Sequence, residues 1–364
     1  MKRYFLSITA IAFLVLSCSK TKQGDLLEIP IDIHQNSSLP LSEITDEIKA
    51  IELELTDKST INTDAFGRVL IYNDYIVVLN DYGKEIILFD GNGRFIRQIG
   101  SRGQGPGEFI RVHGITADIQ NERIFVSTYK KIICYDFESH LINEFYLPQL
   151  ESPSSKYLDY LNNELILICD YLQEQDNDGM YSHSVLYKLN NNFQIKDSIN
   201  IGKAYQDKGS VFFHFCTDFT TTDGDRTYLY YSELGPKSLL CDTLYSIKDN
   251  RLIPELKLKF KDEKVFITDF DKHLYIESIY KSSRYIFSTY VHDRMFYHFC
   301  YDTKTKKGYN MKFYTDDIQR IKKKIFLHPV SADAEKFYYL HTNMDKAAGL
   351  EEPNPTLYIG KLKK

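Results

Sequence analysis

The sequence predicts an all-β chain folded as a six-bladed β-propeller with four-stranded blades. The 364 residues include 28 Tyr and 23 Phe, and aromatic side chains favour the half-buried surface of a pleated strand. The apolar runs are short, and Asn, Asp and Gly interrupt them about every ten residues, which is typical of strands joined by turns. The runs also group in fours, and four strands in about 40 residues make one propeller blade.

The clearest blade spans residues 66–100, which read FGRVLIYND, YIVVLNDYG, KEIILFDGNG and RFIRQIG. Its strands are separated by Asn73-Asp74, Asp81-Tyr82-Gly83 and Gly91-Asn92-Gly93, residue types that tolerate a positive φ. The same template predicts four further complete blades, at residues 112–148, 156–201, 211–260 and 272–313.

The last blade has only three strands of its own, at residues 325–333, 336–343 and 356–364. An unpaired strand edge would stay open there. The alternating segment Ile48–Leu55, IKAIELEL, is the spare strand, and we predict that it pairs with the last blade and closes the ring. A seven-bladed ring and a pair of β-sandwiches are the alternative architectures. Helices are predicted only at residues 42–48 and 316–325.

The first residues have the order of a secretory signal. Lys2 and Arg3 precede an apolar run from Tyr4 to Leu16, which is shorter than the roughly 20 residues that cross a bilayer as a helix. Residues 15–18, Val-Leu-Ser-Cys, resemble a bacterial lipobox, and this resemblance implies that Cys18 becomes the acylated first residue of the mature chain. A plain signal peptide with a chance cysteine is the alternative.

These observations predict three parts: a lipoprotein signal peptide at 1–17, a tether and entry segment at 18–47, and the propeller at 48–364. Residues 19–24 carry no acidic cluster, which favours the periplasmic side of the envelope over the cell surface. The formal net charge of -5 argues against nucleic-acid binding. We expect a monomer that contacts the membrane through its lipid anchor alone. The five remaining cysteines are irregularly spaced and are expected to be buried thiols: Cys134, Cys169, Cys216, Cys241 and Cys300.

Residues 99–109, IGSRGQGPGEF, resemble the blade junction of NHL-type repeats. Together with the lipobox, the entry strand and the ending at residues 354–359, the chain resembles the six-bladed β-propeller lipoproteins of Bacteroidetes, most of which have no known function. The resemblance implies a fold and an envelope location but no catalytic residues. Gly103, Gly105, Pro106 and Gly107 are interpreted as a structural junction, because glycines allow a sharp crossing between blades. The Lys-Ser/Thr of a phosphate loop is missing.

Candidate chemistry is confined to the first strand of each blade, which lines the central channel of a propeller. Six residues there are channel candidates: His113, Asp118, His214, Asp218, His273 and His328. Converging imidazoles and a carboxylate are suited to a divalent metal that activates water. The alternative is that the histidines satisfy buried backbone groups or lie between blades.

The favoured function is a cofactor-free binding or scaffold module for an envelope protein, peptide or glycan, which it engages through loops on one face. The alternative is a metal-dependent lyase or hydrolase with its site in the channel. Insertions at residues 173–183 and 346–355 are expected to project from the rim as recognition loops. Within the first, residues 174–179 are expected to form a mobile acidic loop rather than a calcium site.

Overall fold

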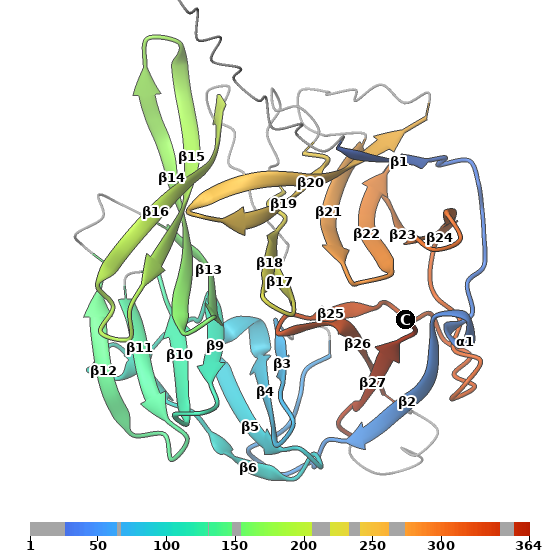
Figure 1. The fold of residues 1–364 in the computed structure, drawn as a ribbon. Helices are drawn as coiled ribbons and strands as arrows, with labels where there is room; N and C mark the ends of the chain where they lie inside the picture. Colours follow the sequence, from blue (N-terminus) through green and yellow to red (C-terminus); the bar gives the residue numbers. More distant parts are fainter. Residues whose placement is uncertain are drawn as a thin grey trace, which may run out of the picture.

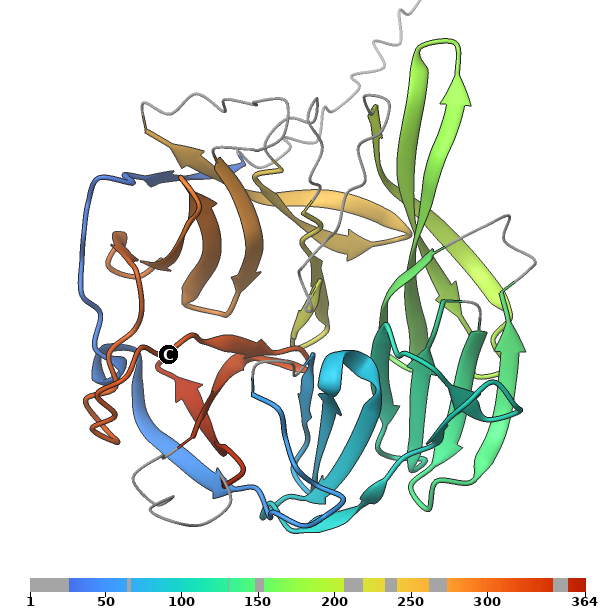
Figure 2. The ribbon, with the colours of Figure 1, turned by 180° about the vertical axis from the view of Figure 1, so that it is seen from behind.

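The computed structural model is a ring of six β-sheets (Figure 1). It describes residues 26–63, 67–129, 131–147, 154–205, 219–232, 241–261, 274–342 and 353–364. Each sheet is one blade, and the strands of a blade follow one another from the centre of the ring to its rim (Figures 1 and 2). The predicted six-bladed propeller is therefore confirmed.

The first three blades follow the predicted order. Blade 1 contains β3 (Val69–Ile71), β4 (Tyr75–Asn80), β5 (Glu85–Asp90) and β6 (Phe95–Gln98), with the short 3-10 helix η1 (Asp81–Gly83) between β4 and β5. Blade 2 contains β9 (Gly114–Asp118), β10 (Arg123–Ser127), β11 (Lys131–Asp136) and β12 (Leu141–Tyr146). Blade 3 contains β13 (Ser154–Leu161), β14 (Glu164–Asp176), β15 (Gly179–Leu189) and β16 (Ile195–Tyr205). The short strands β7 (Ser101–Arg102) and β8 (Glu108–Phe109) pair within the connection from blade 1 to blade 2.

The last three blades include both N-terminal strands. Blade 4 contains β17 (Thr220–Asp223), β18 (Arg226–Leu229), β19 (Thr243–Lys248) and β20 (Arg251–Phe260), and β1 (Leu27–Ile31) adds a fifth strand parallel to β20. Blade 5 contains β21 (Leu274–Lys281), β22 (Tyr285–His292), β23 (Met295–Asp302) and β24 (Lys307–Met311). Blade 6 contains β25 (His328–Val330), β26 (Asp333–His341), β27 (Thr356–Leu362) and β2 (Thr45–Glu52).

The N-terminal segment closes the ring in two places. Strand β2 pairs antiparallel with β27, as the alternation of Ile48–Leu55 predicts. Strand β1 lies inside the segment interpreted as a tether, yet it is part of a sheet. Ile29 and Ile31 are fully buried there, between blades 4 and 5. The propeller therefore begins earlier than residue 48.

Six apolar clusters hold the ring together, one between each pair of neighbouring blades. Successive residues of a strand point to opposite faces of its sheet. Val77 accordingly packs toward blade 2, and its neighbour Val78 packs toward blade 6. Because both faces are buried, the inner strands read as continuous apolar runs rather than alternating ones.

Both helix predictions need correction. Only Leu41–Ile44 is helical (α1), and the chain enters β2 at Thr45. Residues 316–325 form turns instead of a helix. There, Asp316 Oδ1 accepts the backbone N–H groups of Ile318 and Gln319, an arrangement in which a short polar side chain favours a turn over a helix.

Two strand predictions also differ from the structure. The sequence predicts the first strand of blade 4 at residues 211–219, of which 211–218 lie outside the described residues, and the innermost described strand of this blade is Thr220–Asp223. Residues 173–183 do project beyond the ring, as the end of a long hairpin of β14 and β15 (Figures 1 and 2). The expected acidic loop is therefore wrong: Asp176 pairs with Gly179 across a tight turn, and only residues 177 and 178 lie outside the strands. Residues 346–352 of the second insertion lie outside the described part.

Candidate binding site

The centre of the ring holds a buried polar network. Arg68 precedes β3 and is 3% exposed. Its Nη1 donates to the carbonyl oxygens of Ile115 and Leu158, 2.9 Å from each. Its Nη2 donates to the hydroxyl of Tyr157 at 2.6 Å and lies 3.2 Å from Asp159 Oδ2. Arg68 of blade 1 thus reaches past blade 2 to blade 3.

Asp159 is the common acceptor of this network. Its Oδ2 also accepts the hydroxyls of Tyr157 at 2.9 Å and Thr220 at 2.6 Å. Its Oδ1 accepts the hydroxyl of Thr116 at 3.0 Å. Blades 1 to 4 are therefore tied together through one carboxylate, and its hydrogen bonds fix its position.

The channel candidates that lie in described residues occupy separate sites. Nδ1 of His113 lies 2.9 Å from the carbonyl oxygen of Ser155, so this nitrogen donates to the next blade. Asp118 accepts the side-chain amide of Asn121 at 2.7 Å within the β9–β10 turn. His328 stacks on Tyr338 with ring centroids 5.2 Å apart. Of these contacts, the hydrogen bond from His113 to a backbone carbonyl of the next blade is of the kind that the alternative describes, whereas His328 stacks on a residue of its own blade.

The other three candidates, His214, Asp218 and His273, lie outside the described residues. Among the residues that the structure describes, no group of three or more His, Cys, Asp or Glu side chains is arranged to hold a metal ion. The proposed metal site stays a prediction.

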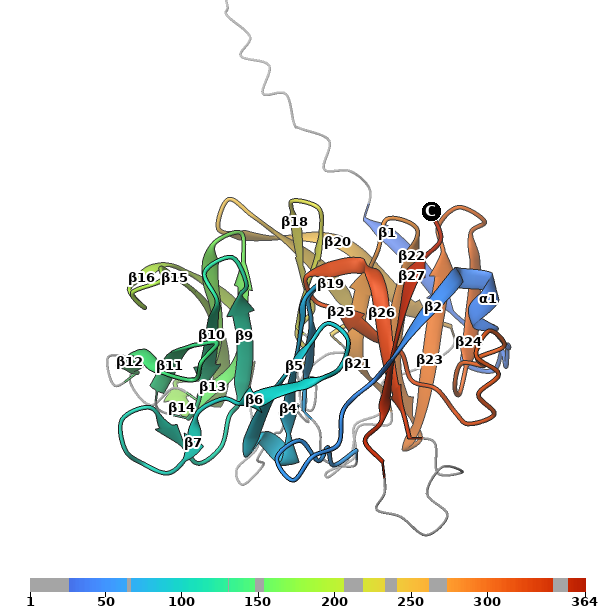
Figure 3. The same cartoon turned by 90° about the horizontal axis from the view of Figure 1, so that it is seen from below.

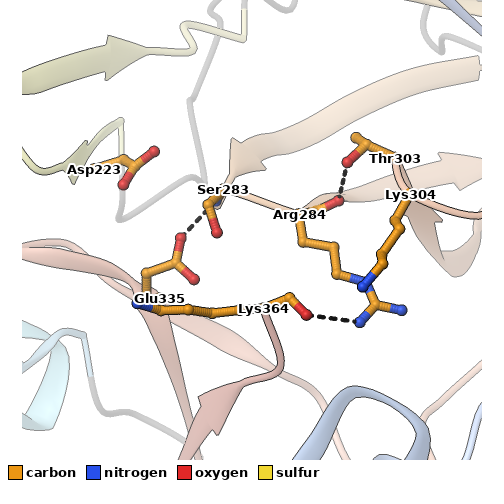
Figure 4. A pocket seen from close by; sticks show the side chains of 7 residues that line it. All are labelled: Asp223, Ser283, Arg284, Thr303, Lys304, Glu335 and Lys364. Carbon is orange, nitrogen blue, oxygen red and sulfur yellow. Dashed lines mark hydrogen bonds between the residues drawn. The ribbon is translucent and has the colours of Figure 1, made fainter.

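A charged pocket opens where blades 4, 5 and 6 meet, with a volume of ≈ 410 Å³ (Figure 4). We call it the three-blade pocket. Blade 4 contributes Asp223 at the end of β17. Turns of blade 5 contribute Ser283, Arg284, Thr303 and Lys304, and blade 6 contributes Glu335 of β26 and Lys364 after β27.

The pocket lies on the face that carries the turn between the first two strands of each blade. We call this the pocket face; the chain's C-terminal end lies on it, on the upper side of Figure 3. The connection that contains β7 lies on the opposite side of the ring.

Arg284 lines the pocket and is held in place by neighbouring groups. Its Nε donates to Asp302 Oδ1 at 3.1 Å and its Nη2 to Oδ2 at 2.7 Å, a bidentate ion pair. The hydrogen bond from Arg284 lowers the pKa of Asp302 to about 2. The Nη1 of Arg284 donates to the main-chain oxygen of Lys364 at 3.1 Å, which links blades 5 and 6. The charge of Arg284 is therefore already balanced within the protein.

Four other charged side chains that line the pocket form no ion pair within the described chain. Glu335 Oε1 accepts the backbone N–H of Ser283 at 2.5 Å, whereas its Oε2 is buried without a hydrogen-bond partner in the described chain. Within the same described residues, the side chains of Asp223, Lys304 and Lys364 form no ion pair or hydrogen bond. In Figure 4, Asp223 and Glu335 lie on one side of Ser283, and Arg284 and Lys304 lie on the other.

A second hollow lies between blades 6 and 1 and has a volume of ≈ 300 Å³. We call it the blade 6–1 groove. Apolar side chains line much of it: Ile51, Ile71, Ile76, Val330 and Ile359. Charged residues also line it, among them Lys336 and Lys361.

The sequence did not single out the residues of the three-blade pocket. They stand near strand ends and in turns of three blades, and no local motif joins them. The singled-out glycines instead lie in the connection between β6 and β9. There the hydroxyl of Tyr135 donates to the carbonyl of Gly107 at 2.6 Å, and Lys131 Nζ donates to the carbonyl of Gly105 at 3.1 Å.

Comparisons with known proteins place the chain in a family without an established function. A family model described as "Domain of unknown function (DUF4934)" matches residues 26–364. No functionally curated protein matches the chain.

Among solved structures, the "Putative exported protein" of Bacteroides fragilis NCTC 9343 is similar with a TM-score of 0.65. It shares 16% sequence identity, and the match covers 93% of this chain and 100% of that one. At this identity the likeness shows the fold alone. A member of the duf4221 family from Bacteroides vulgatus matches with a TM-score of 0.47 at 11% identity, over 88% of this chain and 97% of that one.

Within the described residues, no helix has the length and apolar character needed to cross a membrane.

Proposed function

The chain belongs to the DUF4934 family, and we propose that it is a lipid-anchored binding module of the bacterial cell envelope. It would bind a protein, peptide or glycan partner through the pocket face. The observation that carries this proposal is the set of four charged side chains in the three-blade pocket that form no ion pair within the described chain, together with the buried, unpaired Oε2 of one of them: Asp223, Lys304, Glu335 and Lys364. A buried acceptor without a hydrogen bond destabilises the free protein, and a ligand that donates to it removes that cost.

The location rests on independent observations. The signal sequence and lipobox-like residues 15–18 support export and acylation at Cys18, and the similar Bacteroides fragilis structure is described as exported. The absence of an acidic cluster after Cys18 supports the periplasmic side. Labelling cells with an alkyne-tagged fatty acid tests the anchor: the label should enter the wild-type chain and be absent from the Cys18→Ser variant. Equal labelling of both chains would refute the proposed anchor.

Binding is tested by presenting the purified full-length protein to arrays of peptides and of glycans. We expect ligands that bind the wild-type protein and are lost from the double variant Lys304→Met/Glu335→Gln, which removes one charge of each sign. The matched control is Lys188→Met/Glu138→Gln, which changes the same residue types outside the pocket. An array without ligands would contradict the binding function, and ligands kept by the double variant would contradict the pocket as its site.

A further inference from the structure

The three-blade pocket has an acidic end and a basic end. Glu335 Oε2 is buried without a hydrogen-bond partner in the described chain, and the Asp223 carboxylate lies on the same side of Ser283 (Figure 4). Arg284 and Lys304 lie on the other side of Ser283. One end of the pocket therefore offers hydrogen-bond acceptors, and the other end offers donors.

The charges of the lining do not match a ligand of a single sign. Three of the lining side chains are cationic and two are anionic: Arg284, Lys304, Lys364, Asp223 and Glu335. Asp302 already balances Arg284. Two cations and two anions then remain without an ion pair in the described chain. A ligand that carries one charge of each sign matches this set, whereas a purely basic, purely acidic or neutral ligand does not.

The basic end has donors to spare for a carboxylate. A guanidinium has five N–H donors. Those of Arg284 make three hydrogen bonds in the described chain, two to Asp302 and one to the main-chain oxygen of Lys364. Two N–H groups of Arg284 thus remain, and Lys304 lies on the same side of the pocket. Hydrogen bonds between charged partners are stronger than those between neutral ones, so this end favours a ligand carboxylate.

The size of the pocket suits a small molecule. Its volume of ≈ 410 Å³ falls in the range of about 300–1,000 Å³ that is typical of small-molecule sites. A sphere of that volume is about 9 Å across, and an extended chain spans at most about 3.3–3.6 Å per residue, so both charged ends of a dipeptide fit inside. A longer peptide would extend out of the pocket.

The turn that carries Ser283 and Arg284 is fixed by its own contacts. The Thr303 hydroxyl donates to the carbonyl of Arg284 at 2.7 Å, and the N–H of Ser282 donates to the carbonyl of Tyr285 at 2.8 Å. Arg284 Cζ also lies 4.9 Å from the ring centroid of Tyr285. The basic end is therefore held in place without a ligand, which lowers the entropy lost when one binds.

We propose that the three-blade pocket binds a small zwitterion of dipeptide size, with its ammonium group at the acidic end and its carboxylate at the basic end. This inference rests on the proposed binding function and names its ligand class. The ammonium group donates to Glu335 Oε2, which removes the cost of leaving that buried acceptor unpaired. The carboxylate accepts the spare N–H groups of Arg284. Bonds at both ends fix the direction of the ligand in the pocket.

The probe is alanyl-alanine, and isothermal titration calorimetry with the full-length protein measures its affinity at about pH 7, where both of its ends are charged. Propionyl-alanine has nearly the same shape but lacks the ammonium group, and alanyl-alanine amide lacks the carboxylate charge. We expect each of these two changes to weaken binding at least tenfold, because a hydrogen bond to a charged group contributes more than a neutral one.

The protein variants assign each end of the dipeptide. Glu335→Gln should weaken binding of alanyl-alanine about tenfold and reduce the further loss caused by removing the ammonium group, because both changes disrupt one interaction. Lys304→Met should do the same for the carboxylate, so that amidation costs less than it does with the wild type. Glu138→Gln and Lys188→Met are the matched controls outside the pocket and should bind as the wild type does. Thermal unfolding of each variant checks its fold, and the three ligands test the inference with the wild-type protein alone.

Equal affinity for alanyl-alanine and either of its two analogues would overturn the inference, as would unchanged binding by both Glu335→Gln and Lys304→Met. Failure of alanyl-alanine to bind, while the arrays return a ligand that needs the pocket, would overturn the inference and leave the proposed function intact. If neither the dipeptide nor any array ligand binds, the inference and the proposed function both fail.

Discussion

Replacing Asp159 by Ala should destabilise the propeller more than any single surface change. The carboxylate is buried with Arg68, their side chains being 4% and 3% exposed. Without it, the buried guanidinium loses the carboxylate that lies 3.2 Å from its Nη2. Breaking a buried ion pair from one side costs about 3–5 kcal/mol. The hydroxyls of Thr116 and Thr220 also lose their acceptor. We therefore expect a loss near the upper end of that range, against a total stability of about 5–15 kcal/mol for a typical protein.

Urea unfolding followed by circular dichroism measures this loss as a shift of the midpoint at constant m value. Arg68→Met should cost a similar amount, because it leaves the carboxylate unpaired. The double variant should cost much less than the sum of the two, since neither charge is then left alone. Glu138→Ala, an exposed carboxylate on blade 2, is the control and should change stability by less than about 0.5 kcal/mol. The reasoning is refuted if Asp159→Ala costs less than about 1 kcal/mol or if the two single losses simply add.

Three further predictions concern other parts of the ring. Burial raises the pKa of Glu277 on β21 to about 7, so this carboxyl group keeps its proton in the native state at pH values where it ionises in the unfolded chain. The free energy of unfolding is therefore highest below the ordinary carboxyl pKa and falls as the pH rises to about 7. The Glu277→Gln variant should therefore be more stable than the wild type by at most about 3 kcal/mol at pH 8 and nearly equal to it at pH 4. Thermal melts at both pH values measure the difference, and an equal effect at the two pH values would contradict the prediction. The Ile29→Ala change on β1 should lower the free energy of unfolding in urea by about 2–5 kcal/mol, because Ile29 is fully buried. The control Glu28→Ala changes its exposed neighbour and should have almost no effect. Equal losses would show that β1 does not pack against the ring. Lys203 Nζ lies 3.7 Å from the ring centroid of Tyr181. The Lys203→Met change should therefore speed backbone hydrogen exchange in the β14–β15 hairpin without changing the global melting temperature. Unchanged exchange would refute a stabilising role for this contact.

The ring could be predicted from the sequence because each blade repeats the same short-range signals. In blade 1 the turns at Asn73-Asp74 and Gly91-Asn92-Gly93 mark the strand ends, and the predicted strands agree with β3 to β6. The closing strand was also predictable, since Ile48–Leu55 was a spare strand and the last blade lacked a fourth one. Strand β1 was missed because a five-residue run, LEIPI, is too short to stand out from a tether. The predicted 316–325 helix does not form, because Asp316 accepts the backbone N–H groups of Ile318 and Gln319 in a tight turn.

The candidate site could not be predicted in the same way. A pocket that combines Asp223, Arg284 and Glu335 depends on how far three blades lie from one another, and no periodicity within one blade encodes that distance. The channel histidines were found because inner strands are recognisable, yet His113 and His328 make contacts specific to their own neighbours. Inner-strand position alone does not make two side chains meet.

Strands and turns are under different packing constraints, which explains why the fold could be predicted from the sequence and the candidate site could not. The inner strands bury both of their faces between blades, so nearly every position in them is committed to packing, and Val77 and Val78 contribute to two different interfaces. Polar groups at the centre must then be fully satisfied, as Asp159 is by Arg68 and its other donors. Turns carry no such constraint. Unbalanced charge therefore remains where turns of several blades converge, and on the described part of this ring it does so at the three-blade pocket. A rigid ring holds those turns in place without ligand, which lowers the entropy lost on binding and makes the pocket face suited to recognising a flexible partner.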